Sequence, residues 1–322
     1  MQNIIKIKNI CKNTITVNLV GEEINIFSDT NINYIKKRFS KKQITDHHDI
    51  PFFSIWFIGK EKNLQMFKCK DNYSSTRAND FAKGYYVTNH YGPPSKLFIE
   101  HNEIFILGGD FETILWSYIV KIILLKKSIF ENGSFIKASA IMYKNKATLF
   151  VGNGGSGKTV LVSNLCKNRD IKLICNSNAI IRNNKIIGLG SALRIRSVEN
   201  YPLFDSDDSK LIDPDDYFET KFNTFIDIKN IVIFNYKKEI QSTIQKIGVD
   251  TCYSLMQEFA LGLNVYRLEE DILDSCNTPI EAAKIFRQQS QELLNTIKHA
   301  KNYYMCLNIF NDEDVKKIYE IL

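Results

Sequence analysis

Residues 152 to 159 read Gly152-Asn153-Gly154-Gly155-Ser156-Gly157-Lys158-Thr159. The spacing of the glycines, the lysine and the hydroxyl residue matches the G-x-x-x-x-G-K-[ST] motif in full. An apolar run precedes this stretch at residues 147–151, and a helix-forming run follows it at about residues 158–166. The sequence therefore predicts a strand, a glycine-rich turn and a helix, in that order.

The residue types of this stretch suit a phosphate-binding loop. Successive backbone N–H groups of a glycine-rich turn point inward and bind anions, and glycine tolerates the backbone angles that the turn needs. The N-terminus of the following helix adds partial positive charge. We expect the Lys158 ammonium to reach the β- and γ-phosphates of ATP and the Thr159 hydroxyl to ligate Mg²⁺. All eight residues are candidate nucleotide ligands, and the sequence does not separate ATP from GTP.

Strand-like runs flank the loop on both sides. These runs are residues 135–143 and 147–151 before the helix, and residues 171–175, 179–181 and 185–189 after it. The polar turn Lys144-Asn145-Lys146 joins the first two, and Asn183-Asn184 joins the last two. Adjacent runs joined by such short turns are typical of β-hairpins. Because most P-loops lie in all-parallel sheets, hairpins on both sides predict a mixed sheet.

The rest of this half continues with alternating strands and helices. We expect strands at residues 230–234 and 303–310, and helices at residues 250–263, at residues 279–299 and from about residue 312. Thr278 is a candidate cap with Pro279 in the first turn, and Asn311 is the candidate cap of the last helix.

The loop and its surroundings resemble the HPr kinase/phosphorylase and ATP-dependent phosphoenolpyruvate carboxykinase group, particularly small HPr-kinase-like members such as lasso-peptide kinases. Besides the loop, the resembling stretches are residues 137–141 (Lys-Ala-Ser-Ala-Ile, where the family often has H-A-S-A-V), 173–179, 189–196 and 302–322. The resemblance covers the chain from about Phe135 to its end. It implies an α/β P-loop nucleotide-binding domain over residues 126–322, with a mixed sheet and hairpins. It also implies ATP- and Mg²⁺-dependent phosphate transfer to a hydroxyl of a peptide, protein or small metabolite.

The acid/base half of the family pattern is missing. In the family, the strand after the P-loop helix ends in an acidic pair that handles Mg²⁺ and deprotonates the acceptor. Here those positions are Asn176 and Ser177, the other candidate strand end is Asn235, and the family's hairpin histidine is Lys137. Asparagine can offer an oxygen to Mg²⁺ but brings no charge and accepts no proton at neutral pH. Lys137 is either a phosphate-binding charge or an exposed strand lysine.

The sequence favours one of two functions. This is a kinase-like phosphotransferase whose base is unidentified. The other is a catalytically impaired nucleotide-binding protein that uses ATP as a structural or regulatory ligand, as a sensor or scaffold for a partner enzyme. Removal of a positioned general base costs about 10²–10⁴ in rate, so the missing carboxylates motivate this alternative.

Other charged residues are candidates to complete the site. The segment at residues 201–219 is rich in carboxylates, including Asp207 and Asp208, which could supply a base or a metal ligand; a solvated loop is the alternative. Arg194 and Arg196 are two residues apart and share one face of an expected strand. They could clamp a phosphate or an acidic acceptor, or pair with surface carboxylates.

The first 125 residues predict a smaller, β-rich domain. Strands are expected at residues 15–19, 23–27, 53–58 and 97–99, and a helix from an Asp110 cap to about Lys126. Tyr85, Tyr86 and Tyr91 lie near two prolines and could form a peptide-binding surface that recognises an acceptor, or part of a β-domain core. His47 and His48 precede Pro51 in a polar segment, which favours a turn over a metal site.

Composition limits the class of protein. The 322 residues are 44% hydrophobic and 24% charged, as in ordinary globular proteins. The net charge of +6 is mild, and its densest run, at residues 36–42, has no nucleic-acid-binding motif beside it. A solvated helix face is favoured there over a nucleic-acid groove.

Cysteines and apolar segments predict a cytoplasmic protein without a membrane span. The seven cysteines are scattered without C-x-x-C spacing, which fits reduced thiols better than disulfides or zinc. The N-terminus lacks the apolar stretch of a signal peptide. The most apolar window, about residues 114–125, contains Lys121 and is too short to cross a bilayer. The oligomeric state stays open, a homo-oligomer included.

Overall fold

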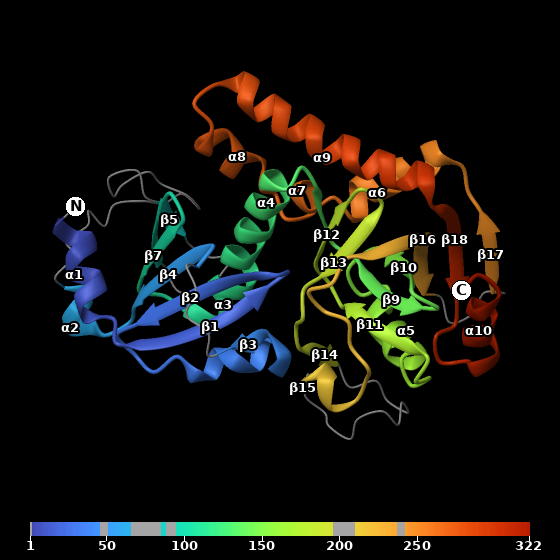
Figure 1. The fold of residues 1–322 in the computed structure, drawn as a ribbon, viewed down its shortest axis with the longest axis horizontal. Coiled ribbons are helices and arrows are strands. Elements are labelled where there is room, and N and C mark those ends of the chain that lie inside the picture. The colour runs from blue at the N-terminus through green and yellow to red at the C-terminus, as the bar shows by residue number, and fades with distance from the viewer. Residues whose placement is uncertain (1, 46–50, 66–84, 88–94, 196–209, 237–241) are drawn as a thin grey trace. The chain divides into compact units, whose positions relative to one another are not determined.

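The computed structural model describes residues 2–45, 51–65, 85–87, 95–195, 210–236 and 242–322. The chain divides into two compact units, Met1–Ile123 and Leu124–Leu322. Both units contain a mixed sheet with helices, so the fold is mixed α/β (Figure 1). Within the described residues, no helix combines the length and the apolar content needed to span a bilayer.

The first unit is built on a seven-stranded sheet. The order across the sheet is β3 (Ile44–Thr45), β1 (Asn13–Leu19), β2 (Glu22–Ser28), β4 (Phe53–Ile58), β7 (Glu103–Leu107), β6 (Ser95–Glu100) and β5 (Tyr85–Val87). β4 is parallel to β2 and β7, and the other pairs are antiparallel. The predicted strands of this region are confirmed, with ends extended by one or two residues.

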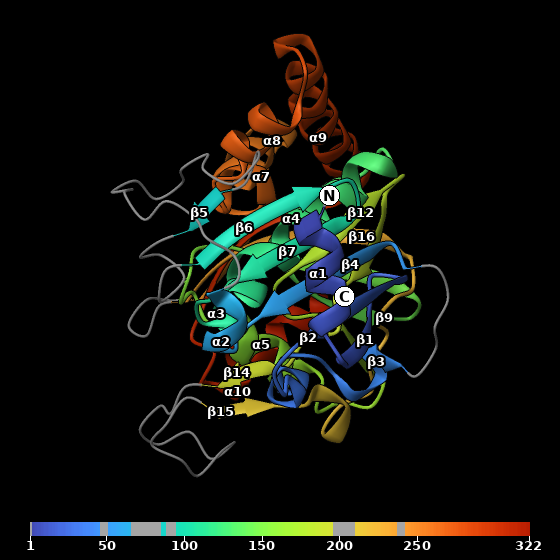
Figure 2. The same cartoon turned by 90° about the vertical axis from the view of Figure 1, so that its left-hand side faces the viewer.

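Helices cover the sheet of the first unit. In α1 (Gln2–Ile10), Ile7 is buried in one cluster with Trp56 of β4 and Phe105 of β7. Figure 2 shows α1 lying across the sheet. From the neighbouring strand position, Phe57 stacks on Phe111 at 4.3 Å between ring centroids, so α3 (Phe111–Ile114) packs against the other face. A short α2 (Glu61–Leu64) follows β4.

The helix predicted from Asp110 is present but longer than expected. The Asp110 carboxylate accepts the Thr113 N–H at 3.3 Å, which caps α3 as predicted. The chain continues through a π-helical turn, η3 (Leu115–Ile119), into α4 (Val120–Phe130).

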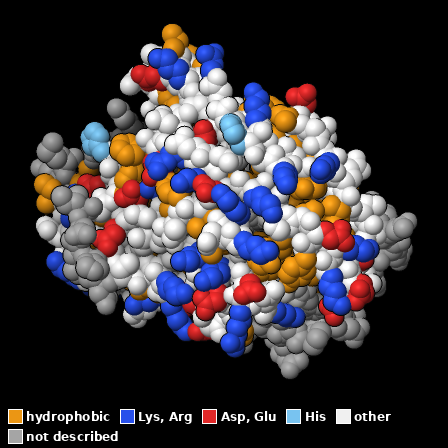
Figure 3. All heavy atoms as spheres, turned by 45° about the vertical axis from the view of Figure 1, so that its right-hand side comes forward, with side chains coloured by type: hydrophobic (Ala, Val, Ile, Leu, Met, Phe, Trp, Pro, Cys, Tyr) orange, Lys and Arg blue, Asp and Glu red, His pale blue; other side chains and the backbone are white. Residues whose placement is uncertain are grey.

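The basic run at residues 36–42 does not form a continuous helix face. It lies on two short 3₁₀ helices, η1 (Asn33–Arg38) and η2 (Lys41–Gln43). Lys37 and Arg38 both pair with the Glu112 carboxylate, so part of the run is neutralised within its own unit. On the face drawn in Figure 3, acidic and hydrophobic side chains lie among the Lys and Arg side chains.

The second unit contains a nine-stranded sheet. Its main path is β11 (Ile171–Cys175), β9 (Ser139–Tyr143), β10 (Lys146–Val151), β16 (Ile226–Tyr236), β13 (Lys185–Gly188), β12 (Ala179–Arg182) and β8 (Ser134–Ile136). Off this path, β18 (Lys301–Leu307) pairs with β16, and β17 (Thr243–Lys246) pairs with β18. β10, β16 and β18 are parallel, whereas β9, β13 and β17 run opposite to their neighbours on this path. A separate pair joins β14 (Leu193–Ile195) to β15 (Lys210–Ile212). The predicted mixed sheet is confirmed.

Both predicted hairpins have the expected turns. Lys144 and Asn145 have φ of 49° and 60°, and Asn183 and Asn184 have φ of 50° and 57°. Positive φ at both central residues is the type I′ geometry of two-residue hairpins. One boundary was wrong: residues 135–143 are two strands, because β8 pairs with β12 while β9 pairs with β10 and β11.

The helices of the second unit cover both faces of its sheet. Figure 1 shows α5 (Lys158–Leu165) on one side and α9 (Pro279–His299) on the other. Leu161 and Leu165 of α5 pack with Phe150 and Val232 in one buried cluster. The predicted caps are present, since Thr278 accepts the Glu281 N–H at the start of α9. Asn311 likewise caps α10 (Asp312–Lys316), and η5 (Lys317–Glu320) follows.

The helix predicted at residues 250–263 is interrupted. α6 (Val249–Phe259) ends at Ala260, α7 (Gly262–Val265) starts after Leu261, and α8 (Glu269–Ser275) follows. The reason is tertiary: the Ala260 carbonyl accepts the Lys137 N–H at 2.7 Å, and Leu261 forms a β-bridge with Ile136. This bridge ties the segment after α6 to the link between β8 and β9.

Candidate functional site

The glycine-rich loop follows the carboxyl end of β10. Because β16 and β18 are parallel to β10, their carboxyl ends lie at the same edge of the sheet. A Cβ added to Gly157 would lie 2.6 Å from Ile309 Cδ1 and 3.4 Å from Tyr236 Cβ, so the loop passes close over both strand ends. Ligands of open α/β sheets bind at this edge.

The loop backbone requires glycine at particular positions. Gly155 and Gly157 have φ of 79° and 82°, in the left-handed region, and Gly157 is the N-cap of α5. A Cβ at Gly152 would lie 2.2 Å from the Phe234 carbonyl oxygen, whereas one at Gly154 would meet nothing within 4 Å. The strand, turn and helix predicted from residues 152–159 are therefore present.

Lys158 lies folded against the loop. Its Nζ donates to the carbonyl oxygens of Gly152 and Asn153, both at 2.7 Å, and to Ser156 Oγ at 3.0 Å. Burial, and then the positive charge of Lys137, lower the pKa of Lys158 to about 8. The ammonium group is thus desolvated and bonded only to neutral oxygens, an environment that an anion in the loop would improve.

The first turn of α5 is joined to the end of β11. Thr159 Oγ1 donates to Asn176 Oδ1 at 2.9 Å, and the Asn176 carbonyl accepts from Ser139 Oγ. Cys175 Sγ donates to the Ala138 carbonyl at 3.3 Å. The structure thus brings the predicted residues Thr159 and Asn176 together and adds Ser139, which sequence reasoning had quoted only as part of a resembling stretch.

A second set of contacts continues from Ser177. Asn178 is 1% exposed; its Nδ2 donates to Ser177 Oγ and its Oδ1 accepts from Tyr266 Oη, both at 2.8 Å. The Tyr266 ring stacks on Phe135 at 5.5 Å, and burial raises the pKa of its phenol. Tyr266 was missed because no local signal marks a residue 88 positions from Asn178.

Lys137 is not an exposed strand lysine. It lies between β8 and β9 and is half-buried, with its N–H bonded to Ala260. Its Nζ lies 5.9 Å from the centroid of the Tyr266 ring, a cation–π contact. Burial lowers the pKa of this ammonium group. Among the described residues, no hydrogen-bond acceptor for Nζ is present.

The other predicted residues are not gathered at the loop by the described structure. Arg194 is exposed on β14, and Arg196, Asp207 and Asp208 lie outside the described residues, as do His47 and His48. The acidic residues that are described bond locally. Asp213 accepts the Asp215 N–H at 3.0 Å, beside the short η4 (Pro214–Asp216), and Asp215 accepts from Thr220 Oγ1 at 2.6 Å.

The described donor set does not fit the expected magnesium ion. Mg²⁺ in nucleotide sites is usually held by one or two carboxylates together with phosphates and water. Here the oxygens beside the loop are those of Thr159 and Asn176, which are neutral and hydrogen-bonded to each other. Within the described residues there is no group of three His, Cys, Asp or Glu side chains able to hold a metal.

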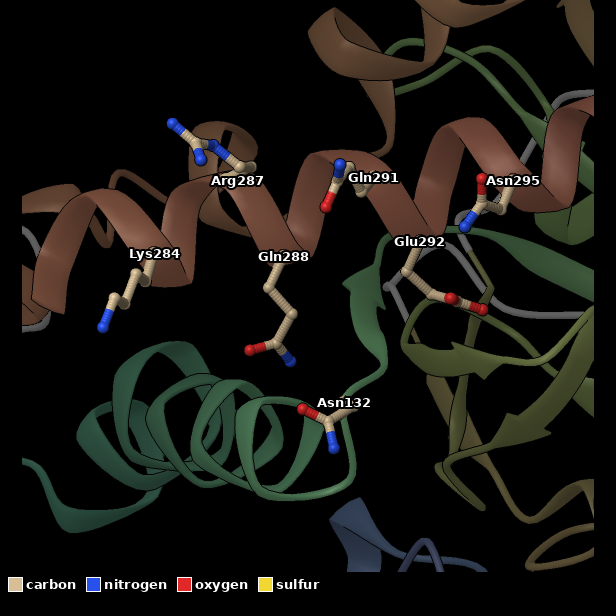
Figure 4. Close-up of a pocket in the computed structure, with 7 residues that line it drawn as sticks. All are labelled: Asn132, Lys284, Arg287, Gln288, Gln291, Glu292 and Asn295. Carbon is tan, nitrogen blue, oxygen red and sulfur yellow. The ribbon is translucent and has the colours of Figure 1, made fainter.

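A groove of about 250 Å³ lies elsewhere in the second unit and contains none of the predicted site residues. Figure 4 shows six of its side chains on α9, with Asn132 opposite. Two of its polar side chains are bonded within the fold: Gln288 Nε2 donates to the Ser128 and Ile129 carbonyls, and Glu292 accepts the Asn183 N–H at 2.6 Å. Burial raises the pKa of Glu292.

Comparisons with known proteins add little to this geometry. No protein family model matches the chain, and the comparison with curated proteins gives no match. One solved structure, the Hpr(Ser) kinase/phosphatase from Coxiella burnetii, is a weak structural neighbour with 16% sequence identity and a TM-score of 0.22. The match covers 35% of this chain and 70% of that chain. At this TM-score the likeness carries no argument about the function of this chain.

Proposed function

We propose that this chain binds a nucleoside triphosphate at residues 152–159 and uses it as a regulatory or structural ligand. The observation that carries the proposal is the loop itself. At Gly152, Gly155 and Gly157 its backbone has no room or no allowed angle for a side chain, and it places Lys158 at the carboxyl edge of a sheet. The backbone N–H groups and the Lys158 ammonium would hold the phosphates.

The residues opposite the loop favour binding over chemistry. A kinase needs a group that accepts the proton of the attacking hydroxyl. Asn176 at the end of β11 and Asn235 near the end of β16 cannot accept one at neutral pH. A sensor or scaffold for a partner enzyme needs only to bind the nucleotide, and the loop at residues 152–159 would do so.

Kinase-like transfer of the ATP γ-phosphate to a hydroxyl of a peptide, protein or small metabolite is the second candidate. Two features favour it: the P-loop strand β10 pairs antiparallel with β9 and parallel with β16, as the resemblance implies, and hairpins lie on both sides of the loop. This candidate requires a carboxylate from a segment outside the described residues, such as Asp207 or Asp208.

Calorimetric titration with ATP and with GTP tests the binding. We expect saturable binding of at least one of them. Lys158→Ala should weaken it by about 10- to 100-fold, because a charge-assisted hydrogen bond contributes about 1.5–3 kcal/mol. Lys146→Ala is the matched control, since Lys146 is an exposed lysine at the start of β10, the end of that strand remote from the loop, and is paired with Asp227. Absence of binding, or equal affinity of Lys158→Ala and wild type, would refute the proposal.

Transfer of label from γ-labelled ATP separates the two candidates. If the chain only binds nucleotide, neither hydrolysis nor transfer to candidate hydroxyl acceptors exceeds the rate without protein. Transfer that depends on Lys158 would establish the kinase candidate instead, and Asp207→Asn and Asp208→Asn would then show whether either residue is its base.

A further inference from the structure

The cations beside the loop face no described anion. Lys158 Nζ bonds to two carbonyl oxygens and one hydroxyl, all neutral. The charge that acts on Lys158 comes from Lys137, and no carboxylate contributes within the described residues. The Lys137 ammonium contacts only the face of the Tyr266 ring among those residues. Two desolvated ammonium groups thus lie near each other with no counter-charge in the described part of the chain, which is unfavourable unless an anion joins them.

Lys137 is held at the same sheet edge as the loop. It directly precedes Ala138, whose carbonyl accepts from Cys175, and Ser139, whose hydroxyl donates to Asn176. Asn176 in turn accepts from Thr159, the residue after Lys158. On the other side, the Lys137 N–H is fixed by the Ala260 carbonyl at 2.7 Å. These contacts fix the backbone of Lys137 beside the phosphate loop.

The Lys137 ammonium group can take over part of the role that Mg²⁺ has in balancing the charge of the phosphates. Mg²⁺ in a P-loop site offsets the negative charge of the β- and γ-phosphates. Lys158 is part of the P-loop motif itself, so Lys137 is the additional cation here: it carries half the formal charge of one Mg²⁺ and needs no carboxylate ligands to hold it. The Thr159 and Asn176 oxygens, which could have faced a metal, are hydrogen-bonded to each other.

We propose that this site binds a nucleoside triphosphate without a divalent cation, and that Lys137 supplies part of the charge that magnesium supplies in other P-loop proteins. The inference rests on the proposed nucleotide binding. It further requires that the affinity for the nucleotide stays the same when magnesium is removed.

The test is calorimetry of the full chain with ATP, in excess EDTA and in excess MgCl₂. Wild type should bind with dissociation constants that agree within about threefold in the two buffers. Lys137→Met, which keeps an apolar stem against Tyr266 but removes the charge, should weaken binding in EDTA by about 10- to 100-fold. Lys137→Arg should retain most of the affinity, and Lys146→Ala should leave it unchanged. Inorganic tripolyphosphate should show the same dependence on Lys137, because the lysine acts on phosphate.

Asn176→Asp provides the converse change. A carboxylate at this position would repel the phosphates in EDTA and offer Mg²⁺ an anionic ligand. We therefore expect at least about tenfold weaker binding in EDTA, recovered in MgCl₂. This variant and the wild-type comparison decide the matter even if Lys137→Met fails to fold.

Three outcomes would be decisive. Wild-type binding in MgCl₂ that disappears in EDTA would overturn the inference and leave the proposed nucleotide binding intact. A folded Lys137→Met variant that binds in EDTA as tightly as wild type would also overturn it. Absence of binding in both buffers would instead refute the proposed nucleotide binding.

Discussion

The candidate site has two sides, the glycine-rich loop and the ends of β11 and β16, and they differ in how well their residues match a P-loop enzyme. On the loop side, residues 152–159 match the P-loop motif, and the backbone around them leaves no space for side chains at Gly152 and Gly157. On the strand-end side, Asn176 and Ser177 stand where the resemblance implies an acidic pair, and Asn235 is at the other candidate strand end. The first side has the groups that would bind phosphate, and among the described residues the second has no carboxylate for proton transfer or metal binding. The proposed function therefore treats phosphate binding and phosphoryl transfer as separable properties of one sheet edge.

The largest effect is expected from the backbone of the loop side. Gly152→Ala would place a Cβ 2.2 Å from the Phe234 carbonyl oxygen, a backbone atom of β16 that cannot rotate away. We expect a loss of about 3 kcal/mol in the free energy of unfolding, at the upper end of overpacking costs. Urea unfolding monitored by circular dichroism measures it.

Gly154→Ala is the control for that substitution. Its Cβ would meet nothing within 4 Å, and Gly154 is not among the positive-φ glycines. The free energy of unfolding should change by less than about 1 kcal/mol. If both variants were equally stable, the glycines of the loop would not differ in the way the contacts require.

Local features of both sides could be predicted from the sequence. The P-loop turn, the two hairpins and the Thr278 cap each depend on residues within a few positions of one another. Their chemistry decides their conformation without help from the rest of the chain, as the positive φ of Asn183 and Asn184 illustrates. For the same reason, the absence of carboxylates at residues 176 and 177 could be read directly.

Features that depend on distant partners could not be predicted. The apolar run at residues 135–143 is divided into β8 and β9 because its first part pairs with β12 and its last part pairs with β10. The interruption after α6 arises because Ala260 bonds to Lys137. The strand β17 and helix α8 carry weak local patterns and were not predicted. These distant contacts also determine the environment of Lys137, which is a half-buried cation beside the loop and not an exposed strand lysine.

The next effect should appear as a pH dependence of nucleotide affinity. Burial and Lys137 lower the pKa of Lys158 to about 8 in the free protein, and a bound triphosphate would raise it again. Below pH 8 the lysine is already charged, so binding takes up no proton there. Above pH 8 the neutral lysine must gain a proton on binding, and affinity falls by up to tenfold per pH unit. The dissociation constant should therefore be roughly tenfold weaker at pH 9 than at pH 7.

Several checks assign this pH dependence to the loop side. Asn176 and Asn235 do not titrate in this range, so the strand-end side adds no slope of its own. Lys137 also has a lowered pKa and faces the same space, so its Met variant should be measured in parallel. Lys158→Arg keeps its charge at all these pH values, and its affinity should be flat. A flat profile in the wild type would contradict the environment described for Lys158.

The smallest effect concerns the link between the two sides. Ser139→Ala removes the hydroxyl that donates to the Asn176 carbonyl. Because Ser139 is buried, we expect a loss of about 1 kcal/mol in the free energy of unfolding, the usual contribution of one hydrogen bond. Ser254→Ala, on an exposed face of α6, should change it by less than about 0.5 kcal/mol. ATP affinity of Ser139→Ala should stay within about threefold of wild type, because the phosphates are held by the loop. A larger fall in affinity with unchanged stability would mean that the strand-end side positions the nucleotide, and the separation of the two sides would then be wrong.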